Sequence, residues 1–436
     1  MKKLILLFSV MLFATGAFAQ GVVALMNRSG DFFEAMNAGK FEEATAYFDP
    51  TLQAQVKPET LKGLWDKLNT QIGKYEALDI VQSKTEGEFF VVIVEGKFEK
   101  DSQRFLLAFN KAEKMVGFYL QPNAPATTYT LPAYADTSKV TQTEVKIKGA
   151  QNDLVGMLTK PKTGSNFPVV ILVHGSGPGD MDQSVGAVKP FKDIALGLAA
   201  QGIASIRYVK RTLVHPQEYK GAFTVKEEVT NDAVTAVNLA KTFPELNKKQ
   251  IYVFGLSLGG MLAPRIATLA PDVKGIILAA APARKFTDLI LEQNNYMFSL
   301  VKDTSDATKQ MFNKSLEVME TTRLNKLGNI KPDSLIVGLP ASYWVDINNY
   351  DQVATAKKLS QRIMVIQGGM DFQVSEADYK IWSTALGKKA NLKFYPELNH
   401  PLTVQTEKGT AEQYKKPANV AEVVINDVAA WIKAGK

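Results

Sequence analysis

The sequence contains no cysteine and only 3 histidines among its 436 residues. Without cysteine the chain can form no disulfide, carry no lipid on a cysteine anchor and use no thiol as a nucleophile. Its stability must therefore come from hydrophobic cores alone. The three histidines, His174, His215 and His400, are dispersed along the chain, which leaves too few ligands for a zinc site in any one region. We accordingly predict no bound metal.

Clusters of like charge and long apolar segments are also scarce. The formal net charge is +7, but Lys and Arg are interspersed with Asp and Glu, as on a solvated surface. A nucleic-acid-binding protein would be expected to show a basic cluster, so we predict no nucleic-acid partner. After the first 20 residues no stretch predicts a transmembrane helix. The composition is typical of a globular protein, and it leaves the oligomeric state open.

The first residues, MKKLILLFSVMLFATGAFAQ, have the pattern of a secretory signal peptide. Lys2 and Lys3 form a positively charged start, the apolar stretch that follows is too short to span a bilayer, and the small-residue sequence Ala-Phe-Ala ends at Ala19. We expect cleavage after Ala19, which removes residues 1–19 and leaves no stable membrane insertion. An uncleaved membrane anchor is the alternative. An exported protein without cysteine fits the periplasm or the exterior of a Gram-negative bacterium.

Residues 20–125 are predicted to form a small α+β domain. Apolar residues at helical spacing run from residue 24 to residue 48 with a break at Gly39, and a further helix is predicted over residues 59–73. Four alternating, aromatic-rich stretches then predict a curved antiparallel sheet. This order of elements resembles the cystatin-like or nuclear-transport-factor-like domains that precede some exported bacterial hydrolases. Such a domain either braces its neighbour or binds a ligand. Residues 121–134 are rich in Pro, Thr and Ala, and we predict a linker over residues 126–139.

The rest of the chain, residues 140–436, has an alternating pattern. Short apolar runs such as PVVILVHG alternate with helical segments, which predicts an α/β fold with a mostly parallel sheet and helices on both faces. An antiparallel pair of strands is expected at its start. Residues 284–350 interrupt the alternation with helical patterns rich in Met, Phe and Tyr. We interpret them as an inserted helical lid, with an ordinary excursion that touches no ligand as the alternative.

The segment VFGLSLGG, residues 253–260, places Ser257 in the pattern G-x-S-x-G. Because the pattern is short, its context decides its meaning. A buried strand is predicted before it and a helix after it, which is the context of a nucleophile elbow. A serine hydroxyl becomes a useful nucleophile only with a base within hydrogen-bond reach. We therefore interpret Ser257 as the nucleophile; a small polar residue in a glycine-rich turn is the alternative.

In a chain with such an elbow, an acid and then a histidine are expected downstream of the serine. His400 is the single histidine after Ser257, and it lies in a loop just beyond a predicted strand. Asp371 follows the apolar strand RIMVIQGG and is our choice for the acid, with capping of the next helix as its alternative role. Glu376 and Asp378 are expected on the surface of that helix.

Attack on a carbonyl also requires N–H donors for the oxyanion of the tetrahedral intermediate. The backbone N–H of Leu258, directly after the nucleophile, is one candidate. The glycine-rich loop HGSGPGDMDQS follows an early buried strand, and we assign the second donor to the N–H of Ser176 in this loop. His174 is predicted to pack and hydrogen-bond beneath the loop, with metal ligation as the alternative.

Together the segments HGSGPGD, GLSLGG, QGGMDFQV and ELNH resemble the oxyanion loop, elbow, acid and base of the α/β-hydrolase superfamily. They are most similar to the serine-esterase branch whose oxyanion loop reads H-G-S-G-P. The segment IRYVKRT resembles that branch's R-Y-D-K-R-G but differs from it at Val209 and Thr212. Its Tyr208, Lys210 and Arg211 are expected either at the site entrance or in a structural turn with solvated charges.

The resemblance implies a carboxylesterase-like serine hydrolase that acts on a small-molecule ester without metal or organic cofactor. The Met-rich and aromatic lid favours an apolar pocket, so we expect short-chain acyl or acetyl esters. Two alternatives remain open at this point. One is a serine peptidase or amidase that uses the same residues, and the other is a non-catalytic ligand-binding protein on a hydrolase scaffold.

Overall fold

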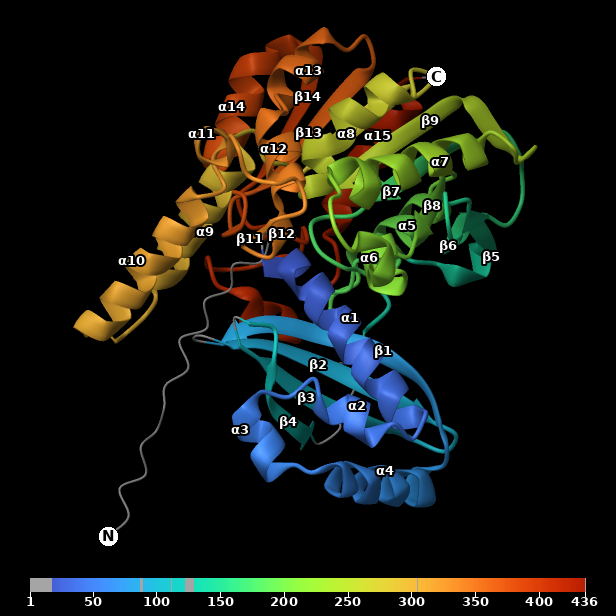
Figure 1. The fold of residues 1–436 in the computed structure, drawn as a ribbon. Coiled ribbons are helices and arrows are strands. Elements are labelled where there is room, and N and C mark those ends of the chain that lie inside the picture. The colour runs from blue at the N-terminus through green and yellow to red at the C-terminus, as the bar shows by residue number, and fades with distance from the viewer. Residues whose placement is uncertain (1–17, 87–88, 111, 122–128, 304, 436) are drawn as a thin grey trace.

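The computed structural model describes residues 18–86, 89–110, 112–121, 129–303 and 305–435. Nearly all of the predicted signal peptide, residues 1–17, lies outside the described residues, as does the start of the predicted linker. Two sheets dominate the fold, one of four strands and one of eight (Figure 1). Among the described residues no helix has the length and hydropathy needed to cross a membrane.

The N-terminal domain contains four helices and an antiparallel sheet of order β1-β2-β3-β4; the sheet is as predicted, whereas the sequence predicts only three of the helices. The helices and strands are α1 (Phe18–Asn37), α2 (Phe41–Thr45), α3 (Pro50–Gln55), α4 (Pro58–Ile72), β1 (Tyr75–Glu86), β2 (Phe89–Phe98), β3 (Ser102–Phe109) and β4 (Met115–Gln121). Gly39, with φ of +72°, separates α1 from α2 at the predicted break. The core is aromatic, with Phe33 packed edge-on against Phe105 and close to Trp65. This domain therefore has a core of its own.

The second domain contains the eight-stranded sheet, of order β14-β13-β10-β9-β7-β8-β6-β5. Its strands are β5 (Val140–Ile147), β6 (Leu154–Pro161), β7 (Phe167–Val173), β8 (Ala204–Tyr208), β9 (Leu246–Leu256), β10 (Gly275–Ala279), β13 (Arg362–Gly368) and β14 (Ala390–Tyr395). The pairs from β8 to β14 are parallel, whereas β6 pairs antiparallel with both β5 and β8. The predicted fold class and the antiparallel start of the sheet are thus confirmed.

Helices cover both faces of this sheet because its central strands are apolar on both sides. Every residue of β7 is buried. One face packs on α5 (Pro190–Ala200) and α15 (Glu422–Lys433), and the other on α7 (Asn231–Ala240), α8 (Leu258–Leu269) and α14 (Glu376–Leu386). Shorter turns connect these layers: η1 (Thr137–Lys139), α6 (Arg211–Val214), η2 (Pro216–Tyr219), η3 (Lys226–Thr230), η4 (Gly387–Lys389) and η5 (Ala411–Lys415).

The insertion predicted over residues 284–350 is helical. It contains α9 (Phe286–Ser299), α10 (Asp306–Glu320), α11 (Leu324–Leu327), the short strands β11 (Leu335–Ile336) and β12 (Leu339–Pro340), and α12 (Ala341–Asn349); α13 (Gln352–Lys358) returns the chain to the sheet. Its aromatic side chains pack into the fold: Trp344 is fully buried in the main core, and Phe298 stacks on Phe312 between α9 and α10.

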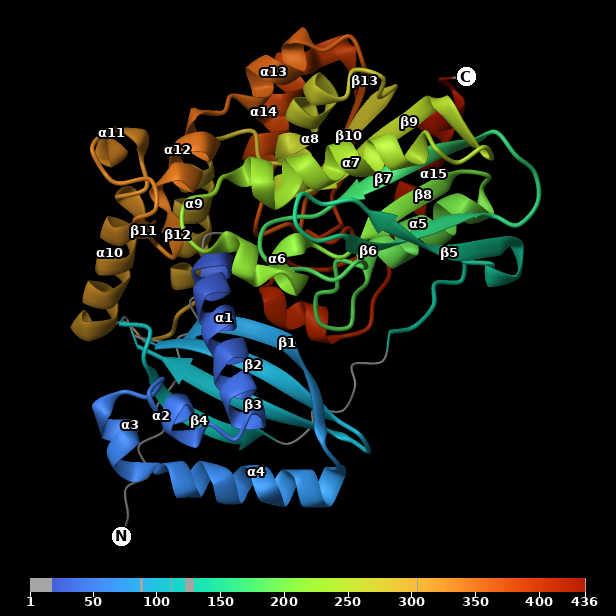
Figure 2. The same cartoon turned by 45° about the vertical axis from the view of Figure 1, so that its right-hand side comes forward.

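The two domains meet along α1. In both views α1 rises from the N-terminal sheet to the second domain, where it contacts η2 and β12 (Figures 1 and 2). The side-chain amide of Asn27 donates a hydrogen bond to the carbonyl of Pro216, at 3.1 Å. The described end of the linker is also fixed to the second domain, because the Tyr129 hydroxyl donates to Asp193 and the Tyr134 hydroxyl to the carbonyl of Val420, both at 2.6 Å.

Candidate active site

Ser257 lies in the tight turn between β9 and α8. Its backbone has φ of +57° and ψ of −120°, a conformation that costs a non-glycine residue roughly 1–3 kcal/mol. The flanking glycines make the turn possible: a Cβ on Gly255 would lie 2.1 Å from the carbonyl oxygen of Gly259, and a Cβ on Gly259 would lie 2.3 Å from that of Val173. The local structure is therefore the strained strand–turn–helix predicted from the sequence.

His400 and Asp371 come together from the loops after β14 and β13. Nδ1 of His400 and Oδ2 of Asp371 are 2.7 Å apart, and the two residues are 8% and 1% exposed. The other carboxylate oxygen, Oδ1, accepts the backbone N–H groups of Gln373 and Val374 at 2.7 and 2.9 Å. The second oxygen, Oδ2, faces the histidine and also accepts the side-chain amide of Gln367 at 3.4 Å, so hydrogen bonds hold both carboxylate oxygens in place.

The alternative role of Asp371 as a helix cap is wrong, because α14 begins at Glu376 and its N-cap residue is Ser375. The expectation for Asp378 is also wrong. This side chain is fully buried, where it accepts hydrogen bonds from the backbone N–H of Ala283 and from the guanidinium of Arg284. Glu376 lies on the helix surface as expected. The sequence pattern of α14 could not reveal Asp378's partner, which lies 94 residues away in the chain.

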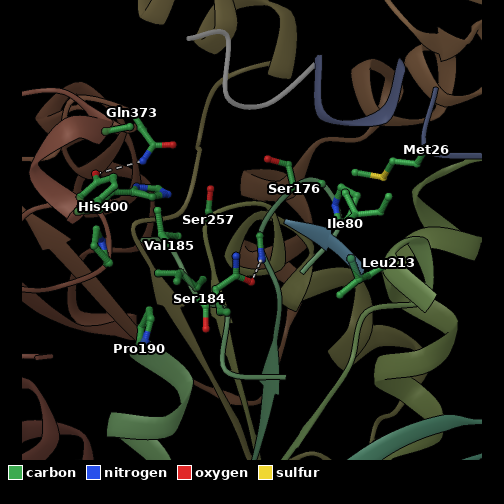
Figure 3. A pocket seen from close by; sticks show the side chains of 18 residues that line it. Met26, Ile80, Ser176, Ser184, Val185, Pro190, Leu213, Ser257, Gln373 and His400 are labelled. Carbon is green, nitrogen blue, oxygen red and sulfur yellow. Dashed lines mark hydrogen bonds between the residues drawn. The ribbon is translucent and has the colours of Figure 1, made fainter. Parts of the chain in front are cut away.

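The hydroxyl of Ser257 points into a cavity, with His400 on one side and Ser176 on the other (Figure 3). No described residue forms a hydrogen bond with this hydroxyl. A catalytic serine–histidine contact is often long in the free enzyme and shortens when substrate binds. Ser257, His400 and Asp371 therefore lie at one end of the sheet in an order that permits proton transfer from Ser257 to His400.

The two predicted oxyanion donors lie beside Ser257. Leu258 is the first residue of α8, where backbone N–H groups have no helical acceptor. The loop that contains Ser176 packs directly on the nucleophile, since a Cβ on Gly175 would lie 3.3 Å from the Cβ of Ser257. Among the described residues neither the Leu258 nor the Ser176 amide has a backbone acceptor. Both amides are therefore available to an oxyanion at this position.

His174 lies beneath the oxyanion loop, as predicted. Its Nε2 is 2.8 Å from the carbonyl oxygen of Asp180, so this nitrogen carries the proton and donates. The ring packs edge-on against Phe191 and Tyr208. Burial lowers the pKa of His174 from 6.5 to about 3, so the ring is neutral at physiological pH. No group of three or more metal-ligating side chains gathers in the described part of the chain.

Tyr208, Lys210 and Arg211 contradict both expectations for them, because all three side chains are buried and none lines the cavity. Lys210 is 2% exposed and pairs with the buried Glu228 of η3. Arg211 pairs with Asp232 at 2.7 Å and with Glu218 at 3.1 Å. A sequence of two adjacent cations after a strand does not show that acidic partners from later helices will bury them.

The cavity above Ser257 has a volume of about 290 Å³. Its lining from the second domain includes Ser176, Ser257 and His400, together with apolar side chains such as Leu213 and Val185. Within the described residues the lining contains no carboxylate, ammonium or guanidinium group. Burial of an ionic substrate group without a counter-charge is costly, so the cavity is suited to an uncharged ligand.

The predicted lid does not line this cavity. None of the described residues of 284–350 is among its walls. Instead, α9 supports a loop that does: Tyr296 stacks on Phe372 and donates a hydrogen bond to the carbonyl of Gly409. The apolar residues of the insertion are used for packing within the fold. Two side chains of the N-terminal domain, Met26 of α1 and Ile80 of β1, line the cavity (Figure 3). The sequence offered no local signal for them.

Two family models match the chain. One, described as serine aminopeptidase, S33, matches residues 166–407, which is more than half of the chain. The other, described as a protein of unknown function (DUF3887), matches residues 29–118 in the N-terminal domain. The first match contains the serine, aspartate and histidine described above.

Among curated proteins, the chain is 32% identical over 403 residues to the esterase EstD from Thermotoga maritima, covering 92% of this chain and 93% of EstD. Two solved structures are more distant. A protein assigned as a dipeptidyl aminopeptidase IV from Bacteroides ovatus is 14% identical with a TM-score of 0.43, and Est1E from Butyrivibrio proteoclasticus is 16% identical with a TM-score of 0.44. They cover 82% and 67% of this chain, which spans 98% of Est1E but only 43% of the first protein, less than half of its length.

Proposed function

The chain belongs to the serine aminopeptidase S33 family and is an esterase of the serine-hydrolase type, and we propose that it cleaves short-chain acyl esters through an acyl-enzyme on Ser257. The observation that carries this proposal is the buried Asp371–His400 pair at 2.7 Å beside a strained serine that opens into an uncharged cavity. The cavity volume of about 290 Å³ is at the lower end for a small-molecule site, which favours short acyl groups.

The mechanism follows from the positions of these groups. His400 Nε2 takes the hydroxyl proton as Ser257 Oγ attacks the ester carbonyl, while Asp371 holds the imidazole through Nδ1 and stabilises the imidazolium. The amides of Ser176 and Leu258 donate to the oxyanion. His400 then gives its proton to the leaving alcohol. A water molecule, activated by the same histidine, attacks the acyl-enzyme and releases the carboxylic acid and Ser257.

The absence of charge in the described cavity lining favours ester over aminopeptidase activity. An aminopeptidase must accommodate the free α-ammonium group of its substrate, and an uncompensated ammonium in a cavity is costly. An ester such as p-nitrophenyl acetate carries no such charge. We therefore expect much faster turnover of p-nitrophenyl acetate than of an aminoacyl p-nitroanilide.

The test of this proposal compares both substrates with the wild-type protein and with His400→Ala. Loss of the general base should lower turnover of the acetate by several orders of magnitude. Near wild-type turnover by His400→Ala would exclude the assigned base. If the wild-type protein turned over the anilide faster than the acetate, we would conclude that it is a peptidase rather than an esterase.

We also propose that the protein is exported, to the periplasm or the exterior of the cell. The support is the sequence pattern that ends at Ala19. Cleavage there would leave Met26 and the rest of the cavity lining in the mature chain. Mass spectrometry of protein from the native cell fractions should find a mature N-terminus at Gln20 outside the cytoplasm; a full-length chain confined to the cytoplasm would contradict export.

A further inference from the structure

Two apolar side chains from the N-terminal domain take part in the catalytic cavity. Met26 comes from the domain's first helix and Ile80 from its first strand. Both lie near Leu213 of α6, which belongs to the hydrolase domain (Figure 3). One wall of the cavity is thus apolar and is shared between two domains, although every group assigned to the chemistry belongs to one of them.

The helix that carries Met26 is fixed against an ordered part of the hydrolase domain. The next residue, Asn27, donates to the carbonyl of Pro216 in η2. This turn is itself restrained, because Glu218 within it pairs with the buried Arg211. Arg211 belongs to α6, which also carries Leu213. One connected structure therefore sets the positions of Met26 and Leu213 relative to each other.

The strand that carries Ile80 is irregular at this point. β1 is an edge strand, and its pairing with β2 shifts register between Ile80 and Gln82. Such a bulge bends a strand and changes the direction of its side chains, and bulges of this kind recur next to active sites. The irregularity occurs where the strand reaches the cavity.

The direction of the chemistry indicates which part of the substrate meets this wall. His400 must reach the leaving oxygen to protonate it, so the alcohol part of the ester lies on the histidine side of Ser257. Figure 3 shows Met26, Ile80 and Leu213 on the opposite side, beyond Ser176. The acyl group extends to that side.

From this arrangement we propose that the N-terminal domain selects the acyl group of the substrate. Met26 and Ile80, together with Leu213, close the acyl end of the cavity and limit the chain length that fits. The selection rests on the proposed esterase function. It gives the N-terminal domain a role in specificity, beyond bracing its neighbour.

The experiment measures kcat/KM for p-nitrophenyl acetate, butyrate, hexanoate and octanoate, which share one leaving group. Ile80→Ala enlarges the acyl end and should raise the ratio of hexanoate to acetate activity about 10-fold, since one or two methylenes in an apolar pocket change kcat/KM by this order. Ile80→Trp fills the same space and should lower the ratio. We therefore expect the two substitutions of Ile80 to shift the ratio of hexanoate to acetate activity in opposite directions.

Two controls distinguish a change in the shape of the cavity from a general destabilisation of the N-terminal domain. Met115→Ala removes a buried methionine from the same domain's core without touching the cavity, and should leave the acyl ratio unchanged. A series of acetate esters with different alcohols should show the same preferences in both Ile80 variants. If both Ile80 variants shift the acyl ratio in the same direction, or if Met115→Ala shifts it equally, acyl selection by this wall is wrong. Loss of all wild-type esterase activity would instead refute the proposed function.

A separate observation concerns Lys210 beneath the oxyanion loop. Its Nζ donates a hydrogen bond to the carbonyl oxygen of Gly175 at 2.8 Å and pairs with Glu228. The second carboxylate oxygen of Glu228 accepts the hydroxyl of Tyr343 at 2.9 Å. These side chains are buried, so their contacts hold the ammonium group in one position beneath the oxyanion loop.

The geometry of the peptide bond transmits this contact to the active site. The carbonyl of Gly175 and the N–H of Ser176 belong to one planar trans peptide, in which the two groups point in opposite directions. When Lys210 holds the carbonyl toward the interior, the Ser176 N–H points the other way. We infer that Lys210 is a positioning residue that directs the Ser176 amide toward the oxyanion.

The test uses Lys210→Met/Glu228→Gln, because replacing both members of a buried ion pair leaves no unpaired charge and is often compatible with folding. Loss of one oxyanion donor should lower kcat for p-nitrophenyl acetate by about 100-fold. KM should change little, whereas affinity for a phenylboronic acid, which forms a tetrahedral adduct on the serine, should fall in parallel with kcat. A folded double variant with wild-type kcat and boronate affinity would overturn this inference.

Discussion

The two sides of the cavity are built in different ways. The hydrolase-domain side holds its reactive groups through buried polar contacts: Asp371 accepts two backbone N–H groups and the His400 ring, and Lys210 fixes the oxyanion loop. The N-terminal side presents the apolar Met26 and Ile80. The hydrogen bond from Asn27 joins that side to its neighbour.

This difference separates two kinds of function. Proton transfer and oxyanion binding require donors and acceptors placed within a few tenths of an ångström, which buried networks provide. Discrimination among acyl chains requires only shape and apolar surface. Changes on the hydrolase side should therefore lower turnover of every ester, whereas changes on the N-terminal side should alter the preference among esters.

The largest effect should follow from removal of the nucleophile. Ser257→Ala leaves no oxygen to form the acyl-enzyme, and loss of a catalytic serine lowers kcat by roughly a million-fold. Stopped assays with p-nitrophenyl acetate and butyrate measure this loss. Substantial residual turnover of either ester would show that the reaction does not depend on Ser257, and would contradict the assignment of the chemistry to this side of the cavity.

The next effect concerns the orientation of the histidine. Asp371→Asn keeps an oxygen for the N–H groups of Gln373 and Val374 but presents an amide donor to His400, which favours the wrong imidazole tautomer. We expect kcat to fall about 10⁴-fold for all esters alike. A loss confined to long acyl chains would assign Asp371 to selectivity and contradict the division between the two sides.

The third prediction concerns folding stability at acid pH, which should depend on a buried histidine of the hydrolase side. The pKa of buried His174 is lowered from 6.5 to about 3, because its charged form would be desolvated. As the pH falls below 6.5, the His174 imidazole therefore becomes protonated in the unfolded chain but stays neutral in the folded protein. This contribution to stability is complete above pH 6.5 and is lost as the pH falls toward 3. Between pH 6.5 and about pH 5 the loss should be about 2 kcal/mol.

Denaturant unfolding of the wild-type protein and of His174→Gln at these two pH values measures the loss. The glutamine amide can still donate to the carbonyl of Asp180 but does not titrate, so the variant should lose less stability in acid. An equal loss in both proteins would remove His174 as its source.

The smallest effect should come from the contact between the domains. Asn27→Ala removes the hydrogen bond to Pro216, whose net contribution is about 1 kcal/mol. The preference for acetate over hexanoate should weaken about 2-fold to 3-fold while kcat for acetate stays near wild type. Gln53→Ala, which removes a similar amide-to-carbonyl hydrogen bond within the N-terminal domain, is the matched control. An equal shift in the control would show that docking through Asn27 has no special role.

The sequence predicted what local pattern and chain order determine. The unbroken apolar strands indicated the parallel sheet, and the glycines around Ser257 indicated the turn that the structure shows. The pairing of His400 with Asp371 followed because a single histidine lies after the serine. Each of these features depends on residues close in sequence or on a choice among very few candidates.

The features that the sequence did not predict depend on contacts between distant segments. Lys210 and Arg211 are ordinary surface residues by type, and their burial depends on acids supplied by η3 and α7. The aromatic residues of 284–350 favoured a lid, but their partners lie in the core. Met26 appears in its helix as one more apolar residue, and its place at the cavity follows only from how the two domains pack.

The most direct test of the central claim is covalent labelling of the intact protein with a fluorophosphonate, followed by mass spectrometry of its peptides. The reagent reacts with a serine that is activated by a base and faces an oxyanion site. We predict one adduct, on Ser257, formed much more slowly in His400→Ala. An adduct on another serine, or rapid ester hydrolysis by a protein that takes no label, would contradict the assignment of Ser257 as the nucleophile.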